Sequence, residues 1–465
     1  MTDLARRLLL PALCVLLVAC WLGGGVTADD TAIDELLQLL ALPVLLMSLL
    51  VMTADGASLP VRAGVVVALL VVLVPVLQQL PLPQAWWGAV PARQALAADL
   101  AQAGVTVQPH WSLAPWGTRK GLLALLPALA AFFAAASLDS RQRRGLARLV
   151  VGLALANVLF AFFQAGLPRD SGLRLYQDFD AGFGGVFANT NHQATACVIA
   201  MVLAVGLGAE ARLRARLGET HPHRQWWYFG LAGFFLLMVP LSTSRAGMII
   251  AFPALALALA ATGALPLRRV WRSRRVAATA AVALLLAVVG VRAAIGWMAV
   301  DQAEELRHVM ASTAVAIGKS EAPLGSGVGS FIPAFEQASP LQLRLANYVN
   351  HAHNEYAQWW MTSGVLGMCV LAATLALLAG IGWHIARSEG RNRALAGAGL
   401  AALCAVLAHS WADYPLRTLT LMATSGALAG LMLAAAGEMH VRHRGHRHAR
   451  GGVAPEAAPD GHPAA

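Results

Sequence analysis

Residues 349–360 read VNHAHNEYAQWW, and the apolar run that follows them continues to His384. Two histidines, two asparagines and a glutamate therefore stand at the entrance of a segment long enough to span a bilayer. The rest of the chain is mostly Leu, Ala and Val, so a polar cluster this dense makes the entrance of that helix the first candidate for chemistry.

Apolar runs of about 20 residues recur on both sides of this stretch, and each is long enough to cross a membrane. Of 465 residues, 58% are hydrophobic and 12% are charged, whereas soluble domains average about 25% charged. The predicted fold class is an all-α polytopic membrane protein with about 12 transmembrane helices. The predicted spans are 8–26, 35–53, 61–80, 121–138, 149–167, 193–209, 226–241, 246–265, 276–295, 357–384, 394–411 and 416–436.

The formal net charge of +10 does not indicate a nucleic-acid partner, because the arginines lie mainly in short loops between apolar runs. Alternate loops are basic, which is the pattern that the positive-inside rule gives to cytoplasmic loops. Both termini are therefore predicted to be cytoplasmic. The long connections 81–119, 168–191 and 297–355 are predicted on the opposite, outer side.

The N-terminal twenty residues, MTDLARRLLLPALCVLLVAC, have the basic start and apolar run of a signal peptide, and LVAC resembles a lipobox. The apolar run continues past Cys20 and more spans follow, so we interpret the segment as an uncleaved first span. The five cysteines lie in or beside apolar runs, which indicates small core residues rather than a disulfide framework.

Three polar motifs fall at the outer ends of predicted helices: FANTNHQA at 187–194, LSTSRAG at 241–247 and HAHNEY at 351–356. Helix N-termini carry unpaired N–H groups and partial positive charge, and so they attract anions. An arginine at such an end, like Arg245, is unfavourable by about 0.3–1 kcal/mol without a counter-anion. These ends predict a phosphate or pyrophosphate site on the outer side, although Arg245 could also snorkel to the interface.

The outer connection 297–355 contains a predicted amphipathic helix at 303–318, a glycine turn at PLGSGVGSF (323–331) and a second helical piece at 341–347. Arg307 on the first of these helices is a second phosphate candidate, because arginine contacts phosphate in a bidentate manner. The alternative is that Arg307 lies on a solvated face.

Histidine is suited to take a proton from a sugar hydroxyl near neutral pH. His351 and His353 are two residues apart and would point to different faces of a helix, so a single catalytic role is favoured over a shared metal. The alternative is a hydrogen-bonded interfacial histidine. His409 and Asp413 are four apart, and they could orient a base, bind sugar or form a structural pair.

Other signals are weaker. Asp178 and Asp180 form a DxD, a metal motif in soluble sugar-nucleotide transferases, but this loop is predicted to face away from cytosolic nucleotides. The GSGVGS stretch lacks a strand-then-helix setting and a P-loop lysine, so a turn is the better interpretation. The His- and Arg-rich tail is predicted to be solvated and disordered. Four tryptophans in 81–119 suit a segment at the membrane interface.

Taken in order, GGVFANTNHQA, LSTSRAG, the stretch from Arg307 through PLGSGVGSF, HAHNEYAQWWMTSGVLG and HSWADYPLR resemble the O-antigen ligase and polymerase superfamily of bacterial envelope glycosyltransferases. The resemblance covers about residues 184–436, and its specificity lies in the order and spacing of the motifs. One departure is PLGSGVG, where a second glycine is expected directly after Pro-Leu.

The resemblance implies a GT-C-like helical fold in the bacterial inner membrane with a periplasmic active site. It implies metal-independent transfer, without a cofactor, of a glycan from undecaprenyl pyrophosphate to an acceptor glycan, lipid A–core or another hydroxyl. Arg245 and Arg307 would bind the pyrophosphate and His353 would activate the acceptor, with His351 as a less certain partner. Supporting residues would be Asn189, Asn191, Asn354, His409 and Asp413.

The implied division of the chain is an N-terminal helical part (1–183), a ligase-like core (184–437) and a cytoplasmic tail (438–465). Ligase, polymerase and protein O-oligosaccharyltransferase activities remain open, with ligase slightly favoured. The alternative from a different class is a transporter of lipid-linked sugars, and a purely structural membrane protein is the third. Transporters tend to place charges near the midplane on broken helices, whereas here they fall at one face.

Overall fold

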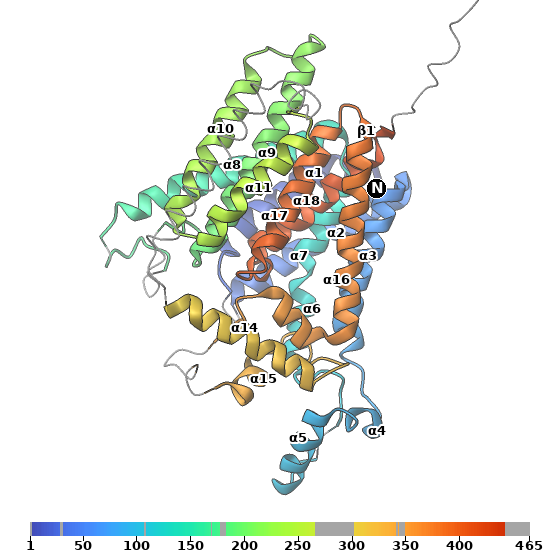
Figure 1. Ribbon diagram of the computed structural model, residues 1–465. Helices are drawn as coiled ribbons and strands as arrows, with labels where there is room; N and C mark the ends of the chain where they lie inside the picture. The colour runs from blue at the N-terminus through green and yellow to red at the C-terminus, as the bar shows by residue number, and fades with distance from the viewer. Residues whose placement is uncertain are drawn as a thin grey trace, which may run out of the picture.

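A computed structural model describes residues 2–27, 31–106, 108–168, 170–176, 183–265, 302–340, 343 and 349–441. These residues form helices almost throughout (Figure 1). In chain order the helices are α1 (Thr2–Gly23), α2 (Ala32–Asp55), α3 (Leu59–Leu77), α4 (Gln84–Trp87), α5 (Pro91–Gln102), α6 (Pro115–Ala124), α7 (Leu126–Ala136), α8 (Ser140–Ala165), α9 (Thr190–Arg216), α10 (Arg224–Met238), η1 (Pro240–Ser242), α11 (Arg245–Ala261), α14 (Gln302–Ser320), α15 (Phe331–Ala338), α16 (Glu355–Arg387), α17 (Arg393–His409), η3 (Pro415–Arg417) and α18 (Leu419–Gly437). Two short strands, β1 (Ser388–Glu389) and β2 (His440–Val441), pair antiparallel.

Nine helical segments of the described chain are long and apolar enough to cross a bilayer, and α11 and α17 are shorter apolar helices. Together they match, in order, eleven of the twelve predicted spans. The predicted span 276–295 lies outside the described residues. The prediction of an all-α polytopic membrane protein is therefore confirmed, whereas the total of twelve spans stays a prediction.

The helix α9 forms the centre of the bundle, because its whole apolar window is buried. The helix α18 is buried over 83% of its window, and α17 packs beside both. Glycines allow these helices to approach closely: an added Cβ at Gly206 of α9 would lie 2.5 Å from the Cβ of Ala398 of α17. The helices α9 and α18, which are the most buried of these spans, both begin at the end of the bundle where the polar motifs lie.

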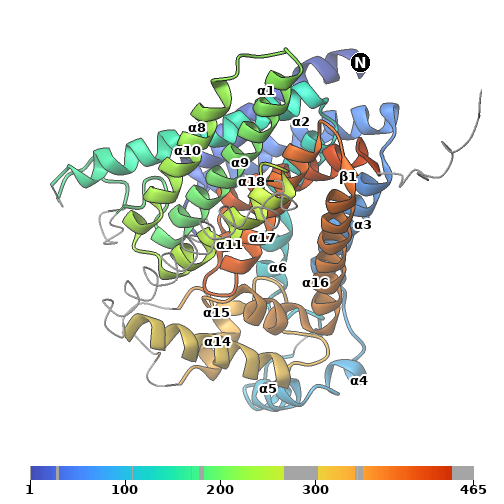
Figure 2. The same cartoon turned by 45° about the horizontal axis from the view of Figure 1, so that its top comes forward.

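The described basic connections, between α7 and α8, α9 and α10, and α16 and α17, lie at the other end of the bundle, near the N-terminus and β1 (Figure 1). The basic residues 268–275 and those of the tail from residue 442 lie outside the described residues. Ion pairs join different parts of the chain there: Arg144 of α8 pairs with Glu210 of α9 over 3.2 Å, and Arg391 pairs with Glu219. The helices α14, α15, α4 and α5 lie at the opposite end, with α14 across it (Figures 1 and 2). This separation agrees with the predicted grouping of loops, and the side of the membrane that each end faces stays a prediction.

The helix α16 is broken at Gly364, which has φ 57° and ψ −150°. The break leaves backbone groups without helical partners, and the glycine-rich segment 321–330 satisfies them. Ser326 N–H donates to the Met361 carbonyl (2.9 Å), Gly327 N–H to Thr362 (2.8 Å), and Val365 N–H to Pro323 (3.0 Å). The GSGVGS stretch is thus a turn, as predicted, whose backbone replaces the missing bonds of a broken membrane helix.

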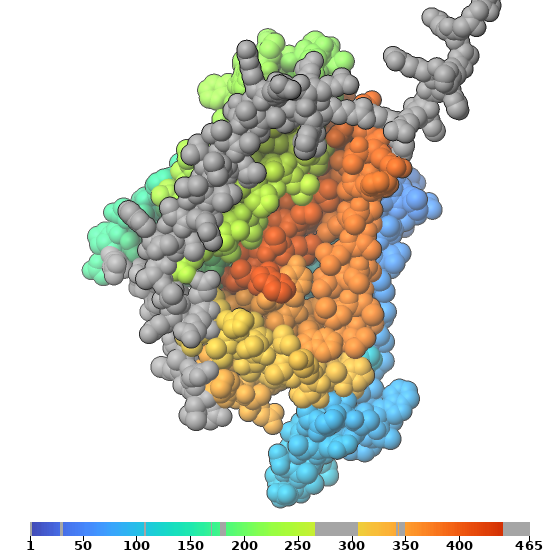
Figure 3. All heavy atoms as spheres, in the orientation of Figure 1, coloured from blue at the N-terminus to red at the C-terminus, as the bar shows by residue number. Residues whose placement is uncertain are grey.

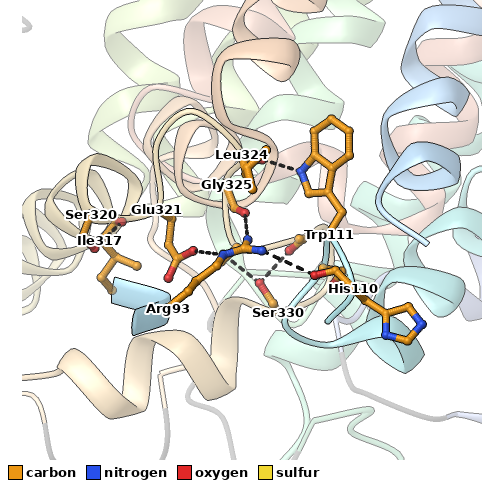
Figure 4. A network of polar contacts seen from close by, with 12 residues as sticks. Arg93, His110, Trp111, Ile317, Ser320, Glu321, Leu324, Gly325 and Ser330 are labelled. Carbon is orange, nitrogen blue, oxygen red and sulfur yellow. Dashed lines mark hydrogen bonds and ion pairs between the residues drawn. The ribbon is translucent and has the colours of Figure 1, made fainter. Parts of the chain in front are cut away.

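Arg93 of α5 ties the loop 81–119 to this glycine-rich segment (Figure 4). Its fully buried guanidinium donates to Glu321 (2.9 Å) and to the Gly325 carbonyl (2.8 Å), while the Trp111 indole donates to the Leu324 carbonyl (2.9 Å). Trp87 is also buried. Trp87 and Trp111 therefore pack within this group of loops, and the position of the segment at the membrane interface stays a prediction.

The predicted amphipathic helix 303–318 is α14, which packs on the outer part of α16 (Figure 3). The helix α15 follows the glycine turn. The second helical piece predicted at 341–347 lies outside the described residues except for Leu343, and so do Asp178, Asp180 and the tail from residue 442. We call the group formed by 81–119, α14, the segment 321–330 and α15 the outer cap.

Candidate active site

The carboxylate of Asp413 is the centre of a polar cluster beneath the outer cap. It is fully buried in the loop between α17 and η3 and receives four hydrogen bonds. Oδ2 accepts from the amides of Asn189 (2.9 Å) and Asn191. Oδ1 accepts from His353 Nδ1 (3.2 Å) and from the backbone N–H of Tyr414 (3.0 Å). So many donors stabilise a buried carboxylate in its ionised form.

Burial on its own raises the pKa of Asp413. The hydrogen bond with His353 and the positive charge of nearby groups, including Arg307, outweigh burial and hold the pKa well below its usual range. The cluster therefore contains a permanent negative charge at neutral pH.

His353 carries a polarised imidazole because of this carboxylate. Since Asp413 can only accept, the proton sits on Nδ1 and the lone pair on Nε2 remains available as a base. The side chain is 17% exposed, and its backbone has φ 50°, a left-handed conformation that costs about 1–3 kcal/mol and clusters at functional sites. Next to it, Asn354 caps α16 by accepting from Ala357 N–H (3.0 Å).

His351 has the opposite tautomer. The Gln358 carbonyl oxygen accepts from the Ala352 N–H (3.2 Å), so its amide group donates to His351 Nδ1 (3.2 Å). Burial lowers the pKa of His351 well below its usual value, assisted by the charge of Arg417, and the ring is neutral. Both histidines lie in the loop before α16, at the helix entrance where the motif was predicted. Both rings pack on Tyr414, with centroids 4.5 Å and 4.8 Å away.

Two further histidines line the inner side of the cluster. His409 ends α17 and bonds through Nδ1 to Thr195 Oγ1 (2.7 Å) and not to Asp413, so of the three alternatives for His409 and Asp413 the direct side-chain hydrogen bond is not formed. His192 of α9 is buried and contacts the Tyr414 ring (5.1 Å between centroids). Among the described residues, neither nitrogen of His192 nor Nε2 of His409 has a hydrogen-bond partner.

The two candidate arginines lie at the same end of the bundle. Arg307 on α14 is close enough for its charge to act on Asp413 and Tyr414. Arg245 is the first residue of α11, whose N-cap Ser244 accepts from Gly247 N–H (3.0 Å). An added Cβ at Gly247 would lie 2.5 Å from the Cβ of Ala194, so α11 begins directly beside the start of α9.

Two residues of this region, Tyr414 and Arg417, could not be recognised as part of the site from the sequence, and Glu355 was noted there only as a member of the polar cluster. Burial and the charge of Asp413 raise the pKa of the Tyr414 phenol to about 12, so it is a neutral platform for both histidines. The Glu355 carboxylate accepts from Leu416 N–H (2.6 Å) and Ser410 Oγ (3.2 Å). Arg417 and Tyr414 both lie in HSWADYPLR, and the signal that could have marked them is a charge and a polar ring just before an apolar run.

A buried anion that orients a histidine, with an arginine at electrostatic distance, can remove a proton from a hydroxyl and stabilise a leaving anion. Within the described ranges, no group of three or more His, Cys, Asp or Glu residues is arranged to hold a metal ion. The fold and this cluster define a polytopic helical membrane protein with a polar site at one end of the bundle.

Residues 230–372 match the family model described as O-antigen ligase. The chain therefore carries an O-antigen ligase domain over these residues, which supports the O-antigen ligase superfamily that the sequence motifs predicted. The match covers the segment from α10 to the first half of α16, which contains Arg245, Arg307, His351 and His353. No curated protein matches the chain.

The family supports a ligase- or polymerase-like function in surface polysaccharide biosynthesis, carried out by a membrane enzyme of the glycosyltransferase kind. It also implies glycan and lipid-linked substrates.

Proposed function

We propose that the protein transfers a glycan from undecaprenyl pyrophosphate to an acceptor hydroxyl at the periplasmic face of the bacterial inner membrane. The observation that carries the proposal is the hydrogen bond from His353 Nδ1 to the buried, ionised Asp413. A histidine oriented in this way presents Nε2 as a base.

In the proposed step, the acceptor oxygen attacks the anomeric carbon of the donor sugar, and the bond from that carbon to the pyrophosphate oxygen breaks. The acceptor proton moves to His353 Nε2, and Asp413 stabilises the resulting imidazolium. The electron pair leaves with undecaprenyl pyrophosphate, whose added charge is stabilised by Arg307 and Arg245. General-base catalysis of this kind contributes about 10²–10⁴ in rate.

His351 is assigned a supporting role, because its Nδ1 lone pair is occupied by Gln358 and its pKa is low. A neutral Nε2–H group next to the base is suited to donate a hydrogen bond to a sugar hydroxyl. Asn189, Asn191 and Asp413 hold the base, and Asn354 fixes the start of α16 beside it.

The experiment is a gel profile of envelope glycans in a deletion strain complemented with wild type, His353→Ala or His308→Ala at matched protein levels. His308 is an exposed histidine beside Arg307 on α14, so its variant controls for loss of a histidine at this end. We expect His308→Ala to restore the profile and His353→Ala not to restore it.

The form of the defect separates the remaining activities. Loss of capped lipid A–core with accumulation of polymerised lipid-linked chains identifies a ligase, and single attached repeats identify a polymerase. Loss of glycan from a pilin or another protein identifies a protein O-oligosaccharyltransferase. Full restoration by His353→Ala would contradict the proposed base and favour a transporter of lipid-linked sugars.

A further inference from the structure

A small polar recess lies at the end of the bundle opposite the candidate active site, where α9 packs beside α8 and α10 (Figures 1 and 2). Four arginines from these three helices line it: Arg144 and Arg148 of α8, Arg214 of α9 and Arg224 of α10. Among the described residues, Glu210 is the only carboxylate of the lining. We call this recess the arginine pocket.

Two carboxylates near the arginine pocket are already engaged. Glu210 is buried on α9 and pairs with Arg144 over 3.2 Å. Glu219 pairs with Arg214 over 3.1 Å and is shared with Arg391, which lies outside the pocket. Neither carboxylate is therefore left to neutralise the remaining arginines.

The other two arginines of the pocket are Arg148 and Arg224, and both are exposed. Neither forms an ion pair with any residue that the structure describes, and Arg224 donates only a long hydrogen bond to the Thr220 hydroxyl (3.5 Å). The hydroxyls of Thr220 and Tyr228 add further donors to the lining. The pocket thus combines excess positive charge with hydrogen-bond donors, which favours an anion with several oxygen acceptors.

The size of the arginine pocket limits which part of a ligand can enter. Its volume of about 20 Å³ admits a group as small as a water molecule, which needs about 10–15 Å³. A phosphate oxygen fits this space, whereas a sugar ring or a nucleobase does not. The pocket therefore suits a phosphate group whose remaining atoms lie outside it.

The arginine pocket lies at the level expected for lipid head groups. The helices α8 and α9 have 26 and 27 residues, so each rises about 39–40 Å and extends beyond the hydrocarbon core of about 30 Å. Arg144 and Arg148 lie only about 6 Å and 12 Å from the start of α8. On the first turn of α10, Trp226 and Trp227 are 65% and 77% exposed, and tryptophan prefers the head-group region.

One side of the arginine pocket is held by contacts of Arg212 near the end of α9. Its guanidinium donates to the Gln225 side chain of α10 (2.7 Å) and to the Ala264 carbonyl after α11 (3.0 Å), and it lies 4.9 Å from the Phe229 ring centroid. These contacts fix the start of α10 against α9, so the pocket is preorganised for a ligand.

We infer that the arginine pocket binds the phosphate of an anionic phospholipid, with Arg148 and Arg224 as its main contacts. A zwitterionic phospholipid is a poorer ligand, because its ammonium group would lie among arginines. Free phosphate lacks the acyl chains that can pack on the largely exposed apolar surface of α10. The inference does not depend on the proposed function. A bound lipid joins α8 and α10 at the end of α9, the helix whose other end carries Asn191.

The test is native mass spectrometry of the full-length protein, purified in a neutral detergent and titrated with phosphatidylglycerol or with phosphatidylethanolamine of the same acyl chains. The pocket variant is Arg148→Gln/Arg224→Gln. The control variant, Arg141→Gln/Arg216→Gln, removes the same charge from exposed arginines of α8 and α9 that do not line the pocket. Both are first compared with wild type by size-exclusion profile and thermal unfolding.

We expect wild type to bind phosphatidylglycerol about tenfold or more tightly than phosphatidylethanolamine, and the pocket variant to lose about tenfold or more of the phosphatidylglycerol affinity. The control variant should stay within about twofold of wild type. Equal binding of the two lipids by wild type would overturn the inference. Equal losses in the two variants would also overturn it, because they would reveal attraction to the basic end as a whole.

Inorganic phosphate separates a lipid site from a site for soluble phosphate. Added at millimolar concentration, with the ionic strength held constant by chloride, it should neither displace phosphatidylglycerol nor raise the unfolding temperature of wild type. A rise in unfolding temperature that is lost in the pocket variant and kept in the control variant would assign the pocket to free phosphate and overturn the lipid assignment.

Discussion

The Nδ1 atom of His353 donates a hydrogen bond to Oδ1 of Asp413 over 3.2 Å, although the two residues are 60 positions apart. The opposite oxygen of the carboxylate is held by two asparagines from the start of α9. One anion therefore joins the entrance of α16, the end of α17 and the entrance of α9, and it fixes the tautomer of the histidine at their junction.

Asp413→Asn should abolish most of the activity without unfolding the protein. An amide in place of the carboxylate no longer selects the Nδ1–H tautomer of His353, and loss of such an orienting partner typically costs about 10–100-fold or more. The measurement is glycan transfer at matched protein level. Asp99→Asn, at an exposed position of α5, is the control, and equal activity of both variants would contradict the assignment.

The free energy of unfolding should decrease as the pH is lowered below about 6.5, in part because of His351. Its folded-state pKa lies below the unfolded value, so the unfolded chain binds more protons as pH decreases. The folded state then loses up to about 1.4 kcal/mol per pH unit for this group, whereas above about pH 6.5 the contribution is constant.

Asp413 contributes no pH dependence to the stability between about pH 5 and 7.5, because its pKa is lowered and it stays ionised. Thermal unfolding of wild type and His351→Gln between about pH 5 and 7.5 checks the prediction. The variant should show a flatter pH dependence, and parallel curves for the two proteins would rule out a neutral buried His351.

Gly364→Ala should destabilise the protein strongly. At φ 57° and ψ −150° the backbone is in a region accessible essentially only to glycine, and an added Cβ would lie 2.3 Å from the Pro323 carbonyl oxygen. We expect a cost of at least about 1–3 kcal/mol in thermal unfolding. Gly380→Ala on the same helix meets nothing within 4 Å and should stabilise by about 0.5–1 kcal/mol.

Arg93→Met should lower stability by about 3–5 kcal/mol, because it leaves the buried carboxylate of Glu321 without its partner. The double variant Arg93→Met/Glu321→Gln should recover part of this loss, since it removes the unpaired charge. Arg119→Met, at an exposed arginine of the same loop, is the control. Additive effects of the two changes in thermal unfolding would show that the pair is not coupled.

The spans and the helix entrances could be predicted from the sequence, because hydropathy and N-cap residues act locally. Asn189, Ser244 and Asn354 cap α9, α11 and α16 as their residue types indicate. His353, Asp413, Asn189 and Asn191 were all named as candidates, and the structure brings them together.

The arrangement of these residues could not be predicted, because it depends on contacts between distant segments. The sequence gives no sign that Asn191 and Asp413, 222 positions apart, share a hydrogen bond, nor that His409 turns to Thr195 instead. His351 and His353 were predicted at the entrance of the helix, and they do lie before it, but their shared contact with the Tyr414 ring could not be predicted. Gly364 was not recognised as a helix break, because its flanking residues remain apolar and helical in pattern.

Gln78 at the end of α3 bonds to Thr362 of α16 (2.9 Å), 284 positions later, and to the Val328 N–H (2.8 Å). During synthesis its buried amide stays without these partners until α16 has left the ribosome, about 15–60 s later at 5–20 residues per second. The outer cap therefore assembles late, after the last third of the chain has been synthesised. Truncation before residue 362 leaves α3 inserted but the hydrogen bond from Gln78 at its outer end to Thr362 unformed.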